Sequence, residues 1–245
     1  QSVQLMKRIF LTNRDYHYRF AAVDANTLGL IGPDGAFELY HGGLRAKDAV
    51  GKTLLDHHDY RDYEQVIREE VKPWSYMKFP FLTQLGPEQG WYRVGPLARV
   101  NNCDRFDTPL AEQERQDFAA AGEGRPLQAA LATHWARLIE LLYCAEAIRD
   151  LLADPDLLGS ELRLRGEMRA KGIGVVEAPR GTLFHHYETD ARGVIKMANM
   201  IVATQNNAAR IAMSVEKAAK GLIKAGQISE IIEIGLCVLD VPTLT

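Results

Sequence analysis

An arginine at the tip of a predicted hairpin is the residue of this sequence best placed to do chemistry. An apolar, largely β-branched stretch at 173–176 leads into Glu177-Ala178-Pro179-Arg180-Gly181, and a second apolar stretch occupies 182–184. Because proline fixes φ and glycine permits conformations that other residues avoid, this pattern predicts a strand, a tight turn and a strand. Arg180 would present a fixed positive charge from a rigid support. A surface hairpin with a solvated arginine is the ordinary alternative for a lone Pro-Arg-Gly triplet.

Two adjacent histidine pairs, His57-His58 and His185-His186, suggest a metal site at first sight. Neighbouring residues on a strand point to opposite faces, so neither pair can chelate one ion as a unit. The His-Glu-x-x-His spacing of helical zinc sites is missing. A zinc hydrolase therefore stays a weak alternative.

Cysteines and glycines give no further site. The three cysteines, Cys103, Cys144 and Cys237, are odd in number and widely spaced, which argues against a disulfide framework, a zinc ribbon or a ferredoxin pattern. The Gly51-Lys52-Thr53 triplet lacks the glycine that a phosphate loop carries five residues earlier, where Ala46 stands. The dinucleotide-binding pattern Gly-x-Gly-x-x-Gly is absent.

Composition indicates an ordinary globular protein. The 245 residues are 47% hydrophobic and 25% charged, with a net charge of −3. This charge predicts neither a nucleic-acid surface nor an electrostatic membrane anchor. No apolar run reaches the roughly 18–20 residues that span a bilayer, and no signal-peptide pattern opens the chain. We expect a cytoplasmic protein, without nucleic-acid or membrane partners, that forms one domain over residues 1–245.

The elements that must position the turn are mainly helical. Dense turn signals from 28 to 55 predict a β-meander, and 73–108 is predicted to be irregular apart from a short strand near 91–94. Predicted helices cover about 6–11, 61–71, 109–121 after a Thr108 N-cap, 127–153 and 207–225, the last followed by Gly226 as C′ residue. Residues 229–239 could form a helix or a strand. The expected fold class is mainly α with small antiparallel β-sheets (α+β).

The longest predicted helix, 127–153, shows apolar residues at steps of three and four. This stripe consists of Leu131, Trp135, Leu138, Leu142, Ala145, Ile148 and Leu152. We expect it to face the core, with Cys144 as a small core hydrophobe and His134 as a buried histidine.

Several long stretches resemble one known family. Residues 16–24, 74–81, 91–101, 134–137, 171–187 and 201–207 are similar to the large subunit of [NiFe] hydrogenases, in particular the cytoplasmic NAD-reducing (bidirectional) type. The resemblance covers almost the whole chain. It implies the central and later part of the large-subunit fold. The implied reaction is reversible H2 oxidation, with electrons passed through Fe–S clusters and flavin to NAD.

The resemblance also implies roles for particular residues. Pro179 and Arg180 match the motif that forms a wall and canopy over the metals, where an always protonated guanidinium acts by electrostatic positioning. Proton acceptance by Arg180 is a further hypothesis. Ala203 and Thr204 match a second wall, where a backbone N–H and a hydroxyl could hydrogen-bond a cyanide. A strand end feeding an Asn206-Asn207 cap is the structural alternative there. Glu177 could orient the turn or be solvated.

Cofactors and partners follow from the family. Its Ni–Fe centre, with CO and cyanide ligands, is held by two Cys-x-x-Cys pairs, and Fe–S, FMN and NAD lie on partner subunits. Expected partners are the small subunit, the diaphorase subunits, maturation factors and an endopeptidase, with H2 and protons as substrate.

This chain departs from the family at the metal ligands. Residues 1–245 contain neither cysteine pair, and near the end Asp240 could stand for the family's motif aspartate while Cys237 cannot replace four thiolates. We therefore expect no metal ligands and no activity in the isolated chain. The alternative is a non-catalytic scaffold or assembly subunit of a hydrogenase-like or respiratory-type complex.

Overall fold

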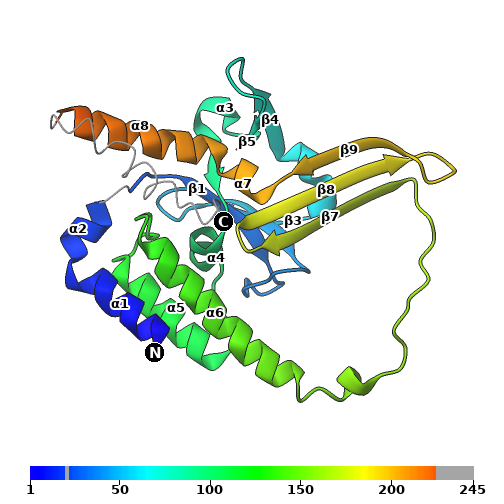
Figure 1. Ribbon diagram of the computed structural model, residues 1–245, viewed down its shortest axis with the longest axis horizontal. Coiled ribbons are helices and arrows are strands. Elements are labelled where there is room, and N and C mark those ends of the chain that lie inside the picture. Colours follow the sequence, from blue (N-terminus) through cyan, green and yellow to red (C-terminus); the bar gives the residue numbers. More distant parts are fainter. Residues whose placement is uncertain (20–21, 225–245) are drawn as a thin grey trace.

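The computed structural model describes residues 1–19 and 22–224, which form a helical layer beside small, mainly antiparallel sheets (Figure 1). This confirms the predicted α+β class. The helical layer consists of α1 (Ser2–Thr12), α2 (Arg14–Arg19), α4 (Pro96–Asn102), α5 (Pro109–Ala121) and α6 (Ala132–Leu151). Thr108 and Pro109 take the N-cap and first helical positions of α5, as predicted.

The described strands form three sheets. The first is β1 (Asn26–Ile31), β2 (Gly43–Lys47), β3 (Thr53–His58) and β6 (Tyr92–Arg93), in the order β3-β2-β1-β6. Its β1-β2-β3 part is the predicted meander, and β6 joins β1 in parallel. The second sheet pairs β4 (Ile67–Val71) with β5 (Lys78–Leu82). The third is the antiparallel β7 (Lys171–Ala178), β8 (Gly181–Thr189) and β9 (Ile195–Ile201).

Short elements connect these layers. They are the 3-10 helices η1 (Tyr60–Gln65) and η2 (Pro155–Leu158), the one-turn helices α3 (Gly86–Gln89) and α7 (Ala203–Asn206), and the long α8 (Ala208–Lys224). The last agrees with the predicted helix at 207–225. Gly226, Cys237, Asp240 and the stretch 229–239 lie outside the described residues.

Two main cores hold the fold together. One lies in the helical layer, where Phe10, Phe118 and Trp135 pack closely. The other lies between the first and third sheets and includes Leu28 and Phe184. Both cores are apolar and almost fully buried, so burial of this area is the main stabilising contribution. The hairpin of β7 and β8 thus rests on the meander.

The predicted helix at 61–71 is wrong. Residues 60–65 form η1, and the chain then extends as β4, where Ile67 pairs with Leu82 and Val71 with Lys78. Pairing with a partner strand about ten residues later outweighs the local helical preference.

The segment 73–108 is more regular than predicted. The short strand near 91–94 is confirmed as β6, but β5, α3 and α4 also form here. Helix α4 is buried nearly all round, including Pro96, Leu97 and Arg99. A helix without a polar face shows no amphipathic period, which explains why periodicity missed it.

Helix α6 begins at Ala132, five residues later than predicted, and its buried face differs from the predicted stripe. Trp135 is fully buried, but Ile148 and Leu152 are mostly exposed. His134 is exposed and is not a core histidine, and Cys144 is half-buried. The buried face instead carries two carboxylates, Glu140 and Glu146.

Glu112 on α5 makes the stability of this layer depend on pH. It accepts hydrogen bonds from Arg115, from the Phe106 N–H and from Gln116. Burial alone would raise the pKa of the Glu112 carboxyl, but these donors outweigh burial and lower it from 4.5 to about 2. Because the folded pKa is depressed, the carboxylate stabilises the fold above about pH 4.5, and this stabilisation is lost as the pH falls toward 2.

We therefore expect the free energy of unfolding to fall between pH 4.5 and about 2, and Glu112→Gln to flatten part of this fall. Urea denaturation at a series of pH values measures both slopes. Identical slopes in the two proteins would contradict the assignment.

Candidate functional site

The predicted hairpin turn is present, and its tip is short. Ala178 at the end of β7 pairs with Gly181 at the start of β8, so Pro179 and Arg180 alone form the tip. Both tip residues are exposed. Figure 1 shows the turn in the middle of the molecule, beside α4 and α7. Arg180 is therefore presented from a rigid strand pair, as its sequence context predicts.

Two glycines let the turn contact the loop that enters α4. Gly181 has φ +136°, and a Cβ there would lie 2.1 Å from Val94 Cγ2. Gly95 has φ +102°, and a Cβ there would lie 3.0 Å from the Arg180 carbonyl oxygen. Such φ values and distances suit glycine alone. The backbone of the turn thus lies directly against Val94-Gly95.

Glu177 orients the turn and is not solvated. Its side chain is fully buried. Oε1 accepts hydrogen bonds from the Leu30 N–H at 2.9 Å and from Thr182 Oγ1 at 2.8 Å. Oε2 accepts from Arg99 Nη1 at 2.9 Å. One carboxylate therefore connects both strands of the hairpin with β1 and α4.

Arg99 on α4 completes this buried cluster. Its Nη1 also donates to the Ala178 carbonyl at 2.9 Å, while Nε and Nη2 donate to the two carboxylate oxygens of Glu140 on α6 at 2.6 and 2.7 Å. Burial alone would lower the pKa of Arg99, but Glu140 and Glu177 outweigh burial and hold it above its ordinary value. Arg99 and Glu140 were not predicted as site residues. The available signal was a charged residue inside the apolar stretch 94–100.

The predicted second wall lies at the start of α7. β9 ends at Ile201, Val202 is the N-cap, and Ala203 and Thr204 open the helix. Ala203 is buried and Thr204 is half-buried. This position combines both interpretations of the segment, since a strand end leads into the helix that carries the two asparagines.

The asparagines tie α7 to the same region as the turn. Asn206 Nδ2 donates to the Thr182 carbonyl at 2.8 Å, and Asn206 Oδ1 accepts from the Tyr92 hydroxyl at 2.6 Å. Asn207 Oδ1 accepts from the Val94 N–H at 2.9 Å. The structure thus brings the Pro179-Arg180 tip, Val94-Gly95 and α7 into one constellation.

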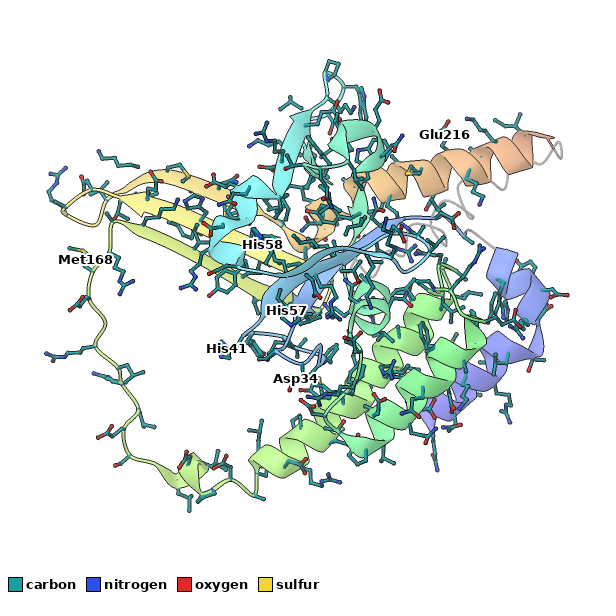
Figure 2. The ribbon with its side chains drawn as sticks, turned by 180° about the vertical axis from the view of Figure 1, so that it is seen from behind. Asp34, His41, His57, His58, Met168 and Glu216 are labelled. Atoms are coloured by element: carbon teal, nitrogen blue, oxygen red, sulfur yellow. The ribbon has the colours of Figure 1, made fainter. Side chains whose placement is uncertain are left out.

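The histidines lie elsewhere and have other partners. Figure 2 shows His57 and His58 on the meander, with His41 and Asp34 in neighbouring loops. His186 on β8 is buried, and its Nδ1 lies 3.2 Å from the Tyr63 hydroxyl. Within residues 1–19 and 22–224, no group of three or more His, Cys, Asp or Glu side chains could hold a metal ion. The histidines therefore add no observation in favour of a zinc hydrolase.

The described cysteines do not fit the role of metal ligands. Metal binding needs a thiolate. Burial raises the pKa of the Cys103 thiol to about 12, and its Sγ lies 3.7 Å from the Val100 carbonyl within the helical core. Burial, with a contribution from Glu140, also raises the pKa of Cys144. The described part of the chain can supply the surroundings of a metal centre but not its ligands.

Comparison with known proteins agrees with this constellation. No family model matches the chain. The chain is 44% identical over 229 residues to the NAD-reducing hydrogenase HoxS subunit beta of Cupriavidus necator, covering 90% of this chain and 47% of that protein. It is 40% identical over 225 residues to a vhu-encoded chain of the F420-non-reducing hydrogenase of Methanococcus voltae, covering 91% of this chain and 52% of that protein.

Solved structures show the same relationship. A crystal structure of an NAD+-reducing [NiFe]-hydrogenase in the H2-reduced state matches with a TM-score of 0.89 at 44% identity, covering 97% of this chain and 54% of the other. A [NiFeSe]-hydrogenase of Dm. baculatum shares the fold alone, with a TM-score of 0.61 at 20% identity over 84% of this chain and 46% of the other.

The fold is therefore that of a hydrogenase large subunit. The chain belongs to the [NiFe] hydrogenase large-subunit family, with close similarity to the NAD-reducing type. It is a partial chain that spans about half the length of the curated relatives it matches. Among the described residues, no helix is both long enough and apolar enough to cross a membrane.

Proposed function

We propose that this chain forms part of the large subunit of a cytoplasmic, NAD-reducing [NiFe] hydrogenase that oxidises H2 reversibly. Electrons would pass through the Fe–S clusters of a small subunit, then through the flavin of a diaphorase, to NAD. The observation that supports this most is the 44% identity, over 97% of the chain, to a solved NAD+-reducing [NiFe]-hydrogenase. The tip and α7 lie together within this matched fold.

In this proposal the chain provides two walls around the reaction space. Arg180 contributes a fixed positive charge and directed donors, and Pro179 restricts the backbone beside it. Ala203 and Thr204 contribute backbone N–H groups that have no intrahelical acceptor in the first turn, and Thr204 adds a hydroxyl. These groups can hold charge and hydrogen-bond acceptors at set positions without rearranging during the reaction.

The cofactors would come from other parts of the enzyme. A Ni–Fe centre with CO and cyanide ligands, when bound, supplies the site at which H2 is split, and its thiolate ligands would come from outside residues 1–19 and 22–224. Fe–S clusters, FMN and NAD would belong to the small and diaphorase subunits, and maturation factors and an endopeptidase would act during assembly. The isolated chain would then lack activity.

Metal analysis of the purified chain and of the assembled hydrogenase tests this function. We expect nickel, iron, infrared bands of CO and cyanide, and H2-dependent NAD reduction in the assembled enzyme only. Nickel, iron and those bands on the isolated chain would refute its inactivity, and zinc alone would favour a hydrolase. An assembled enzyme that cannot couple H2 to NAD would refute the proposed reaction.

A further inference from the structure

The buried Glu140–Arg99–Glu177 cluster, hereafter the ion cluster, holds both residues that flank the tip of the hairpin. Arg99 donates to the Ala178 carbonyl on one side of the tip. Glu177 accepts from the Thr182 hydroxyl on the other side. The tip residues themselves, Pro179 and Arg180, are exposed. The position of Arg180 is therefore determined from below, by groups that do not reach the surface.

The outer carboxylate, Glu140, determines how Arg99 is oriented. Its two oxygens take Nε and Nη2 of the guanidinium in a forked pair. Such a pair fixes the plane of the guanidinium, so the remaining Nη1 must point at Glu177 and Ala178. Glu140 lies on α6, in the helical layer, and both of its carboxylate oxygens are engaged by Arg99. It therefore acts on the turn through Arg99.

The same cluster reaches the second wall. Thr182 donates its hydroxyl to Glu177 and accepts at its carbonyl from Asn206 of α7. A short chain of hydrogen bonds thus joins Glu140 to the helix that carries Ala203 and Thr204. A shift of Arg99 would change both the turn and its distance from α7.

The charge balance argues for positioning over simple stability. Two carboxylates and one guanidinium are buried together, and a buried ion pair is often no more stabilising than apolar residues of the same shape. What such a cluster adds is direction, because its hydrogen bonds are charge-assisted and geometrically strict.

We propose that the ion cluster is a positioning device for Arg180, in which Glu140 controls the orientation of the tip through Arg99 and Glu177. Its effect on turnover rests on the proposed hydrogenase function, but its effect on the turn does not. Glu140, Arg99 and Glu177 are positioning residues and touch no reacting group.

Glu140→Gln tests this with little change of shape, because the amide keeps the size of the side chain and removes one acceptor. Glu112→Gln is the matched control, since Glu112 makes the same forked pair with Arg115 at 2.8 Å for both bonds, on a helix away from the turn. Glu140→Asp retains the charge and should restore part of the effect.

Amide hydrogen exchange of the 177–184 peptide, followed by mass spectrometry, is the first measurement. We expect Glu140→Gln to speed exchange there by about tenfold, the change that loss of one charge-assisted hydrogen bond predicts, and Glu112→Gln to leave it unchanged. Unchanged exchange in Glu140→Gln, or an equal increase in both variants, would overturn the proposal whatever the enzyme's activity.

A double-mutant cycle in the assembled hydrogenase is the second measurement. If the cluster acts through Arg180, Glu140→Gln lowers H2-dependent turnover by about tenfold in the parent enzyme and hardly at all when Arg180 is already lysine. Equal losses in both backgrounds would show a merely structural role and overturn the proposal. An Arg180→Lys enzyme with full turnover would instead refute the role of Arg180, while the exchange measurement still decides on the positioning of the turn.

Discussion

Arg180→Lys in the assembled hydrogenase should lower H2-dependent NAD reduction by roughly 10²–10³-fold, the loss typical of removing one preorganised donor from a reaction site. Lysine keeps the positive charge but replaces a planar fork of five donors by a mobile ammonium group. The substitution lies at an exposed tip whose supporting contacts come from the backbone and from Glu177 and Arg99. Folding and metal content should therefore be unaffected.

Arg192→Lys provides the control for this substitution. Arg192 is an exposed arginine in the turn between β8 and β9, at the opposite end of the same sheet. Turnover should be unchanged there, and nickel and iron should be equal in all three enzymes. Full turnover of Arg180→Lys, with metals bound, would remove Arg180 from the reaction. A loss of metal would mean instead that the arginine maintains the site during assembly.

Gly181→Ala should destabilise the chain by about 2–5 kcal/mol, because it combines backbone strain with overpacking. The residue has φ +136°, which side-chain-bearing residues rarely adopt. Its Cβ would also lie 2.1 Å from Val94 Cγ2 and 2.9 Å from the Gly95 nitrogen. The valine side chain could move, but the backbone of the loop could not do so cheaply.

Gly174→Ala in the middle of β7 is the matched control, since nothing lies within 4 Å of a Cβ at that position. Urea denaturation should give a midpoint close to that of the parent for this variant and a clearly lower one for Gly181→Ala. Equal midpoints would show that the turn does not need its close contact with Val94-Gly95. Because Gly181 adjoins Arg180, turnover of any folded Gly181→Ala enzyme should fall as well.

How far sequence reasoning succeeded depended on the range of the interactions. The hairpin at 171–189, the meander and α5 rest on turn residues, caps and β-branched runs that act within a few positions, and all three were predicted. The 61–71 segment was misassigned because its strand is stabilised by pairing with β5. Helix α4 was missed because a helix buried on all sides shows no period.

The site divides in the same way. Pro179, Arg180, Ala203 and Thr204 were found from short motifs whose wording resembles one family, and the family itself is confirmed by the comparisons. Their catalytic roles remain predictions. Arg99 and Glu140 carry no local pattern that marks them, because their partners lie far away in the sequence.

By itself, the sequence determined the family, the fold class and the hairpin that presents Arg180, since these depend on local backbone preferences and on motifs that can be recognised in one dimension. Only the tertiary structure decided what supports that arginine. Charges from α4, α6 and β7 become one buried cluster when the helical layer packs on the sheets. Burial strengthens such interactions and makes them directional, and burial is a property of the folded chain.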